Sequence, residues 1–139
     1  MDRTPVQNSA RLVGIVFLLV GIAGFIPGVT TNLYDGLEFA GDDGTAELLG
    51  LFEVSVLHNI VHGLFGIAGL ALAATASGAR TYLLGGGAIY LALFLLGIFG
   101  GGEWIPVNNA DNWLHLVLGA GMIGLGVLTT RESRVASPA

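Results

Sequence analysis

The sequence predicts an all-α integral membrane protein, a four-helix bundle built from two tandem helical hairpins. Three observations predict it. Of the 139 residues, 53% are hydrophobic and 11% are charged, and the mean hydropathy of +0.78 lies far above that of soluble domains. Four apolar stretches are each long enough to cross about 30 Å of hydrocarbon, which takes roughly 20 helical residues. A polar motif inside these stretches also occurs twice.

The four expected spans cover about residues 12–28, 54–76, 82–99 and 113–129. Residues that interrupt helices separate them: Pro27 and Gly28 end the first, Ser77 and Gly78 follow the second, and Pro106 follows the third. The spans and their connections account for the whole chain, so we expect a single domain over residues 1–139.

A secretory signal peptide is the alternative interpretation of the first span, because Arg3 and Arg11 precede an apolar run. No pattern of small residues for cleavage follows it cleanly. Residues 14–24 moreover resemble residues 87–97, at an offset of 87 − 14 = 73 positions. The first span therefore reads as a repeat of the third, and we expect it to be retained as a helix.

The duplicated polar motif lies 53 positions apart: Val54, Ser55, His58, Asn59, His62 and Gly66 return as Val107, Asn108, Asp111, Asn112, His115 and Gly119. Because polar groups are costly in lipid, the two sets are expected to face each other or a shared ligand inside the protein. Two spans per repeat give both halves the same orientation, with a pseudo-twofold axis along the membrane normal. The offsets differ by 73 − 53 = 20, so the first connection is 20 residues longer than its equivalent.

Charge sets the expected orientation. All five basic residues fall on one side of the predicted spans: Arg3, Arg11, Arg80, Arg131 and Arg134. The charged residues on the other side are all acidic: Asp35, Glu38, Asp42, Asp43, Glu47, Glu53, Glu103 and Asp111. Because cytoplasmic loops retain Lys and Arg, we expect both termini in the cytoplasm of a multi-pass protein of the cell membrane. Zero cysteines exclude disulfides and thiolate sites.

The connection over residues 29–52 is expected to be a negatively charged exterior loop that lies over the end of the bundle. Within it, residues 47–52 are expected to form a short interfacial helix, with Thr45 as its cap.

The motif contains two pairs with helical spacing. His58 and His62 are four residues apart, as are Asp111 and His115, so the members of each pair share one side of a helix. At 1.5 Å of rise per residue, the first member of each pair lies about 7 Å and the second about 13 Å below the exterior boundary.

Three interpretations remain open for this polar core. In the first, its side chains only bond across helices and no cofactor is present; its remaining members are Ser55, Asn59, Asn108 and Asn112. In the second, a transition-metal ion is held by His58, His62, Asp111 and His115. In the third, His62 and His115 are axial ligands of haem b between the halves. Transport, with these residues along an ion or proton path, is a further alternative.

An enzyme is not expected, because no histidine stands in a recognisable relation to a nucleophile. The net charge of −5 and the absence of a basic cluster disfavour nucleic acid as a partner. The expected function is that of a small structural or accessory membrane protein. Its expected partners are the lipid bilayer and either a second copy of the chain or another membrane protein.

Residues 52–66, with the sequence FEVSVLHNIVHGLFG, and residues 109–119, with NADNWLHLVLG, resemble the two signatures of domain-of-unknown-function family 4383. This is a family of small bacterial four-helix membrane proteins. The resemblance implies the fold and a bacterial cytoplasmic membrane location, and it brings no activity, substrate or cofactor. Ser55 departs from the pattern, which is expected to carry Asn there as Asn108 does in the second half, and this predicts a weaker polar network in the first half.

Overall fold

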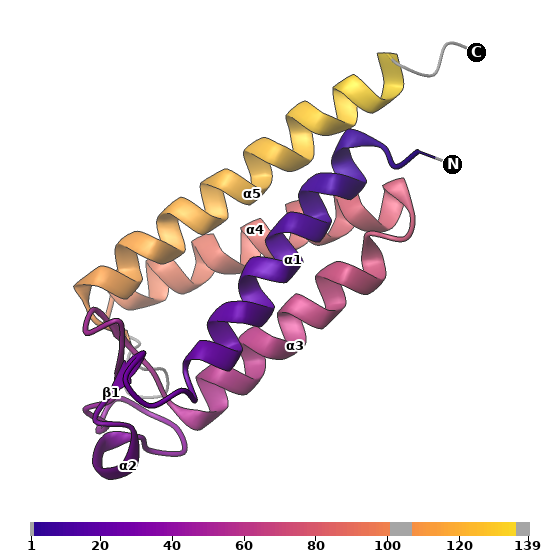
Figure 1. Cartoon of the computed structure of the whole chain (residues 1–139). Helices are drawn as coiled ribbons and strands as arrows, with labels where there is room; N and C mark the ends of the chain where they lie inside the picture. Colours follow the sequence, from indigo (N-terminus) through magenta and orange to yellow (C-terminus); the bar gives the residue numbers. More distant parts are fainter. Residues whose placement is uncertain (1, 101–106, 136–139) are drawn as a thin grey trace.

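A computed structural model describes residues 2–100 and 107–135 of the chain. In chain order the elements are α1 (Pro5–Ala23), β1 (Thr30–Thr31), α2 (Leu33–Gly36), β2 (Glu47–Leu48), β3 (Phe52–Glu53), α3 (Val56–Leu72), α4 (Ala76–Ile98) and α5 (Asn109–Val135). The four long helices α1, α3, α4 and α5 lie side by side as a bundle (Figure 1). Both ends of the chain lie at one end of this bundle, and the short elements lie at the other.

Side-chain caps begin three of the long helices. The Ser55 hydroxyl accepts the His58 N–H at 3.1 Å to start α3, and the Thr75 side chain caps α4. At the start of α5 the Asn108 side-chain oxygen accepts the Asp111 N–H at 2.9 Å. Each cap satisfies an N–H that has no partner inside its helix. The two copies of the polar motif thus perform the same local role, each starting a helix.

Among the described residues, three helical segments are long and apolar enough to cross a membrane: Pro5–Ala23, Ala76–Ile98 and Asn109–Glu132. The fourth long helix, α3, is apolar but has 17 residues, which at 1.5 Å per residue is about 26 Å. This is at the short end of the range for a spanning helix. Large apolar side chains such as Leu12, Leu19 and Leu64 are exposed on the outside of the bundle. Such a surface is typical of helices that face lipid.

The helix bounds differ from the predicted spans at polar ends. The first helix begins at Pro5 rather than near residue 12, because the Thr4 backbone N–H donates to the Gln7 side chain in a capping box and Pro5 suits the first helical position. Ser77 and Gly78, expected in a connection, lie in the first turn of α4. The helix α5 continues through polar residues to Val135. Hydropathy predicts only the apolar part of each helix, whereas the residues at which a helix begins and ends within polar sequence depend on capping interactions.

Some sequence expectations fall outside the described residues. The helix-interrupting Pro106 and the acidic Glu103 are among them.

Residues 24–55, which join α1 to α3, form a small folded unit that we call the acidic cap. Its strands make an antiparallel sheet in the order β1-β2-β3, with Thr30 opposite Leu48 and Leu48 opposite Phe52. The expected helix over residues 47–52 is therefore wrong, and Thr45 caps no helix there. Leu49 and Gly50 have φ values of 56° and 66°, which turn the chain into a hairpin. The class is mostly helical with a small sheet, rather than all-α.

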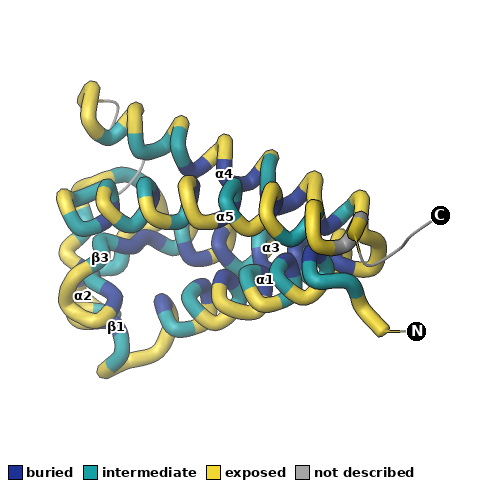
Figure 2. The backbone as a smooth tube through the Cα atoms, turned by 90° about the horizontal axis from the view of Figure 1, so that it is seen from above, coloured by how far each residue is buried: buried dark blue, intermediate teal, exposed yellow. Residues whose placement is uncertain are grey.

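Glycine contacts bring the helices of each hairpin together. A Cβ atom on Gly66 of α3 would lie 2.7 Å from the Gly14 carbonyl oxygen of α1, and one on Gly87 of α4 would lie 2.8 Å from that of Gly119 of α5. No side chain fits at such separations, so the backbones are in direct contact. Between the hairpins the buried side chains are large; they include Phe17, Tyr82, Leu83, Tyr90 and Met122. Figure 2 shows buried positions along the inward faces of these helices.

Candidate functional site

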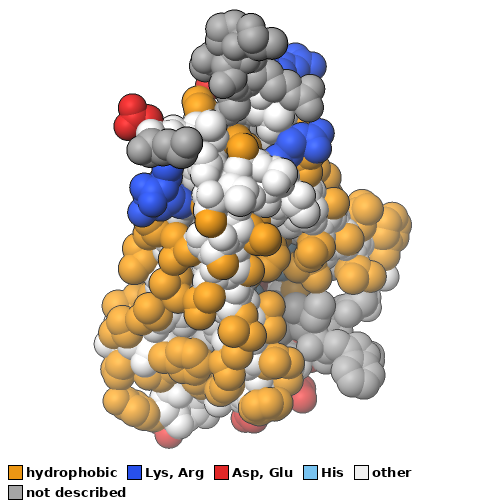
Figure 3. Space-filling model, turned by 90° about the vertical axis from the view of Figure 1, so that its right-hand side faces the viewer, with side chains coloured by type: hydrophobic (Ala, Val, Ile, Leu, Met, Phe, Trp, Pro, Cys, Tyr) orange, Lys and Arg blue, Asp and Glu red, His pale blue; other side chains and the backbone are white. Residues whose placement is uncertain are grey.

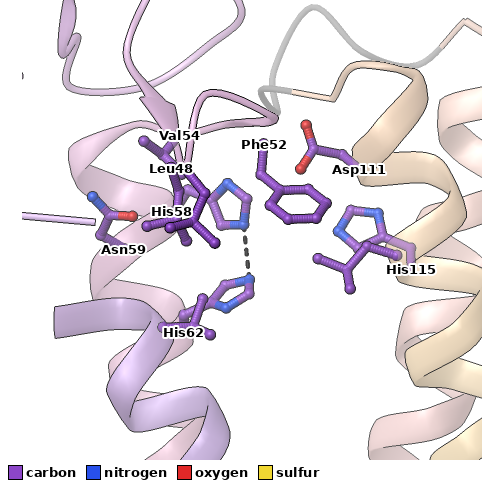
Figure 4. Close-up of a pocket in the computed structure, with 11 residues that line it drawn as sticks. Leu48, Phe52, Val54, His58, Asn59, His62, Asp111 and His115 are labelled. Carbon is purple, nitrogen blue, oxygen red and sulfur yellow. Dashed lines mark hydrogen bonds between the residues drawn. The ribbon is translucent and has the colours of Figure 1, made fainter. Parts of the chain in front are cut away.

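The predicted polar side chains surround one cavity under the acidic cap. His58 and His62 reach it from α3, and Asp111 and His115 reach it from α5. The cavity has a volume of about 140 Å³ and is covered by cap residues that include Phe52 (Figure 4). Of the four polar side chains, His62, Asp111 and His115 are 6%, 1% and 2% exposed. They are turned into the protein and away from the exposed apolar outer surface, as the duplicated motif predicts.

The two histidines of α3 form a close pair. The Nε2 atoms of His58 and His62 are 2.8 Å apart, and the ring centroids are 4.4 Å apart. A hydrogen bond of this kind holds one proton between the two nitrogens, so one ring donates and the other accepts. Since both rings belong to α3, this bond does not join helices.

Tyr90 of α4 connects the two halves of the site. Its ring centroid is 6.3 Å from that of His62 and 5.4 Å from that of His115, and its hydroxyl lies 3.5 Å from His62 Nε2. Phe17 of α1 packs against both His62 and Tyr90. The sequence interpretation missed these two aromatic residues. A tyrosine in the middle of an apolar span was the available signal, because a buried hydroxyl needs a partner.

Asp111 and Asn108 attach the acidic cap to α5. One carboxylate oxygen of Asp111 accepts two backbone N–H groups, from Glu53 of the cap at 3.1 Å and from Asn108 at 3.0 Å. The Asn108 amide donates to the Leu51 carbonyl of the cap at 2.8 Å. The second copy of the motif therefore bonds to backbone some 57 residues earlier in the chain.

The two asparagines that follow in the motif each lie against a glycine. Asn59 of α3 donates its amide to the Gly24 carbonyl at 2.9 Å, across the first hairpin. A side chain on Gly24 would overlap the Asn59 amide, and one on Gly97 would overlap that of Asn112. Asn59 thus joins α3 to the end of α1. Asn112 occupies the equivalent position against α4, but its Oδ1 has no hydrogen-bond partner among the described residues.

The four candidate metal ligands share the cavity without converging. Within residues 2–100 and 107–135, no three His, Cys, Asp or Glu side chains come close enough together to hold a metal ion. The Phe52 ring lies between His58 and His115 (Figure 4). Haem b does not fit between His62 and His115 either, because the Tyr90 ring packs against both, and 140 Å³ is below the roughly 300–1,000 Å³ of pockets for drug-sized ligands.

The surroundings of the cavity are negatively charged. The acidic cap carries six Asp and Glu residues, counted over residues 24–55, and no Lys or Arg. Partial burial, together with the neighbouring charges of Asp42 and Glu47, raises the pKa of Glu53 above its ordinary value. The described Arg side chains lie at the opposite end of the bundle from the acidic cap (Figure 3). A cation is therefore favoured at the cap end and an anion is disfavoured.

Comparison with known proteins bears on the family and the fold. No curated protein and no solved structure matches the chain. One family does, and its model, described as "Domain of unknown function (DUF4383)", matches residues 7–128. This range includes every residue of the cavity and all four long helices apart from their outer ends. The chain belongs to the DUF4383 family.

Proposed function

We propose that the protein is a small structural or accessory protein of the cell membrane, in which the polar motif fastens the two hairpins and the acidic cap together. The observation that carries this proposal is the set of partners to which the side chains of the motif form hydrogen bonds. Asn59 bonds to the end of α1, while Asn108 and Asp111 bond to the backbone of the cap. Each of these bonds joins parts of the chain that are far apart in sequence, as a structural fastening requires. No catalytic step is part of this proposal.

The proposal includes an internal repeat with a pseudo-twofold axis along the membrane normal. Two sets of contacts support it. The glycine contact of Gly14 with Gly66 has a counterpart in Gly87 with Gly119, at offsets of 87 − 14 = 73 and 119 − 66 = 53. The asparagine against a glycine of the preceding helix also recurs at these two offsets.

It also includes four spans with both termini in the cytoplasm and the acidic cap outside. The separation of arginines from the cap supports this orientation. Because the chain has no native cysteine, single-cysteine variants test it cleanly. In intact cells a membrane-impermeant maleimide should label Asp43→Cys in the cap and leave Ser77→Cys at the other end unlabelled until the cells are opened. The reverse labelling would contradict the orientation.

A metal-binding function is the second candidate, and one observation favours it. Two nitrogens that bind one metal ion at right angles, as in a tetragonal or octahedral site, each at about 2.05 Å, would be about 2.9 Å apart. The Nε2 atoms of His58 and His62 are 2.8 Å apart. The same separation suits a single hydrogen bond, and these two nitrogens provide two ligands, so a metal ion would need further ligands from elsewhere.

Metal analysis and an absorption spectrum of the purified protein separate the two functions. The structural function predicts a colourless protein without stoichiometric metal, in which His62→Ala and His115→Ala lower only the thermal stability. A stoichiometric metal that is lost in His58→Ala and His62→Ala would favour the second candidate. A Soret band that is lost in His62→Ala would show that the space between His62 and His115 holds haem.

A further inference from the structure

The structural function leaves the cavity itself unexplained. A fastening needs hydrogen bonds between elements, but the His58–His62 pair lies within α3 and reaches another element only through the 3.5 Å contact of His62 with the Tyr90 hydroxyl. His115 makes no hydrogen bond within residues 2–100 and 107–135. The Nδ1 atoms of His62 and His115 are buried and have no hydrogen-bond partner within the described residues. Buried polar atoms normally have hydrogen-bond partners, so unpaired imidazole nitrogens beside a cavity indicate a ligand-binding site.

The residues that line the cavity limit the kind of ligand that fits. Most of the eleven lining residues are apolar, and those of the cap and the flanking helices are Val20, Leu48, Leu49, Phe52, Val54 and Leu114. The polar groups are confined to five side chains: three imidazoles, the Asn59 amide, which already donates to the Gly24 carbonyl, and the Asp111 carboxylate. An apolar wall with a few polar groups suits a molecule with an apolar body and one polar head. At about 140 Å³ the molecule has only a handful of non-hydrogen atoms.

The sign of the head group follows from the charges. Neither the lining nor the acidic cap contains Lys or Arg, and Asp111 is the one lining group that carries a charge at neutral pH when the imidazoles are neutral. One oxygen of Asp111 accepts two N–H groups, and a carboxylate has about four acceptor sites, so acceptor capacity remains on the other oxygen. A cationic head that donates hydrogen bonds complements these groups, whereas an anion would meet a like charge.

The polar atoms that line the cavity suit an organic cation better than a metal ion. Alkali and alkaline-earth ions need a shell of oxygen ligands, and transition metals need at least three converging ligands, which the described residues do not offer here. A primary ammonium group has three N–H donors that reach separate acceptors. Phe52 lies between His58 and His115 and presents an aromatic ring to the same space, which also attracts a cation (Figure 4).

We infer that the cavity under the acidic cap binds a short primary alkylammonium ion, with its head toward Asp111, His115 and the Phe52 ring and its alkyl chain against the other apolar residues of the lining. The carboxylates of the cap, among them Glu47 and Glu53, raise the local concentration of cations at the entrance. This inference is independent of the proposed structural function, because hydrogen bonds that hold the cap in place neither require nor prevent a ligand in the cavity beneath it.

The test measures binding of n-butylammonium to the purified full chain in detergent by isothermal titration calorimetry. Isosteric n-butanol and butyrate test the charge of the head, and sodium at equal ionic strength tests general salt effects. We expect saturable binding of n-butylammonium, at least tenfold weaker binding of n-butanol, and none of butyrate. Equal binding of n-butanol would overturn the inference and leave an apolar cavity only, and no binding of n-butylammonium would overturn it as well.

Two variants locate the site. His115→Gln should weaken n-butylammonium binding at least tenfold, because it replaces a lining imidazole with a side chain of different reach. Tyr82→Phe is the matched control, since Tyr82 is buried in the bundle core and does not line the cavity. A thermal unfolding curve for each variant establishes that it is folded. Binding that persists in His115→Gln, or that is lost equally in Tyr82→Phe, would refute this location; neither result bears on the fastening bonds of Asn59 and Asn108.

Discussion

Replacing Gly66 with alanine tests the closest contact between α1 and α3. The added Cβ would lie 2.5 Å from the Leu18 backbone nitrogen, 2.7 Å from the Gly14 carbonyl oxygen and 2.8 Å from the Leu18 Cα. Ordinary contacts begin at about 3.4 Å, so the helices would have to separate by roughly 1 Å. These neighbours are backbone atoms, which have no other rotamer to adopt.

The expected magnitude follows from two opposed effects. Overpacking in a close-packed interior costs about 1–3 kcal/mol. Alanine is also favoured over glycine in a helix by about 1 kcal/mol. Gly63, three residues earlier on α3, provides a matched control, because a Cβ there meets nothing within 4 Å. Since the helix propensity gain is common to both variants, Gly66→Ala should be less stable than Gly63→Ala by about 1–3 kcal/mol.

The measurement is the free energy of unfolding in mixed micelles, followed by near-UV circular dichroism as SDS is added. Near-UV signals report tertiary packing, whereas the helices themselves persist in detergent. We expect Gly63→Ala to match or exceed the parent protein in stability and Gly66→Ala to fall below Gly63→Ala. If Gly66→Ala proved as stable as Gly63→Ala, the direct backbone contact between α1 and α3 would be refuted.

Three further predictions use the same unfolding measurement. Asn59→Ala should lose roughly 0.6–1.7 kcal/mol, the range for hydrogen bonds between membrane helices, because its amide no longer reaches Gly24; an unchanged stability would contradict the clamp. Leu49→Asn should gain about 1 kcal/mol, since Leu49 has a φ of 56° and is 65% exposed, and asparagine tolerates this conformation; a loss would show that the leucine side chain matters more than its backbone. Folding raises the pKa of Glu53, so the folded state holds its proton to higher pH than the unfolded state does, and this carboxyl lowers stability as the pH rises through that window. Glu53→Gln should therefore equal the parent protein at acidic pH and exceed it at neutral pH, and a difference that does not depend on pH would argue against the raised pKa.

The sequence was sufficient to predict the helices, because their apolar composition and length are local properties. The same holds for the polar motif: a charged or polar group inside an apolar span has to turn away from lipid, so His62, Asp111 and His115 were predictable as buried. Residues 47–52 were mispredicted for an equally local reason. Their composition fits an interfacial helix, but residues 47–48 pair with residues 30–31 on one side and with residues 52–53 on the other, and this pairing makes them strands.

The sequence by itself determined that this chain is an apolar helical protein with a duplicated polar motif, since hydrophobicity and spacing are written in the order of residues. Only the tertiary structure decided what the motif's members do. Whether Asp111 binds a metal or the Glu53 backbone, and whether Tyr90 separates His62 from His115, depends on how the helices pack and on where the acidic cap folds back. Those contacts join residues up to 58 positions apart. The local sequence around each residue does not determine how far apart two such residues lie in space.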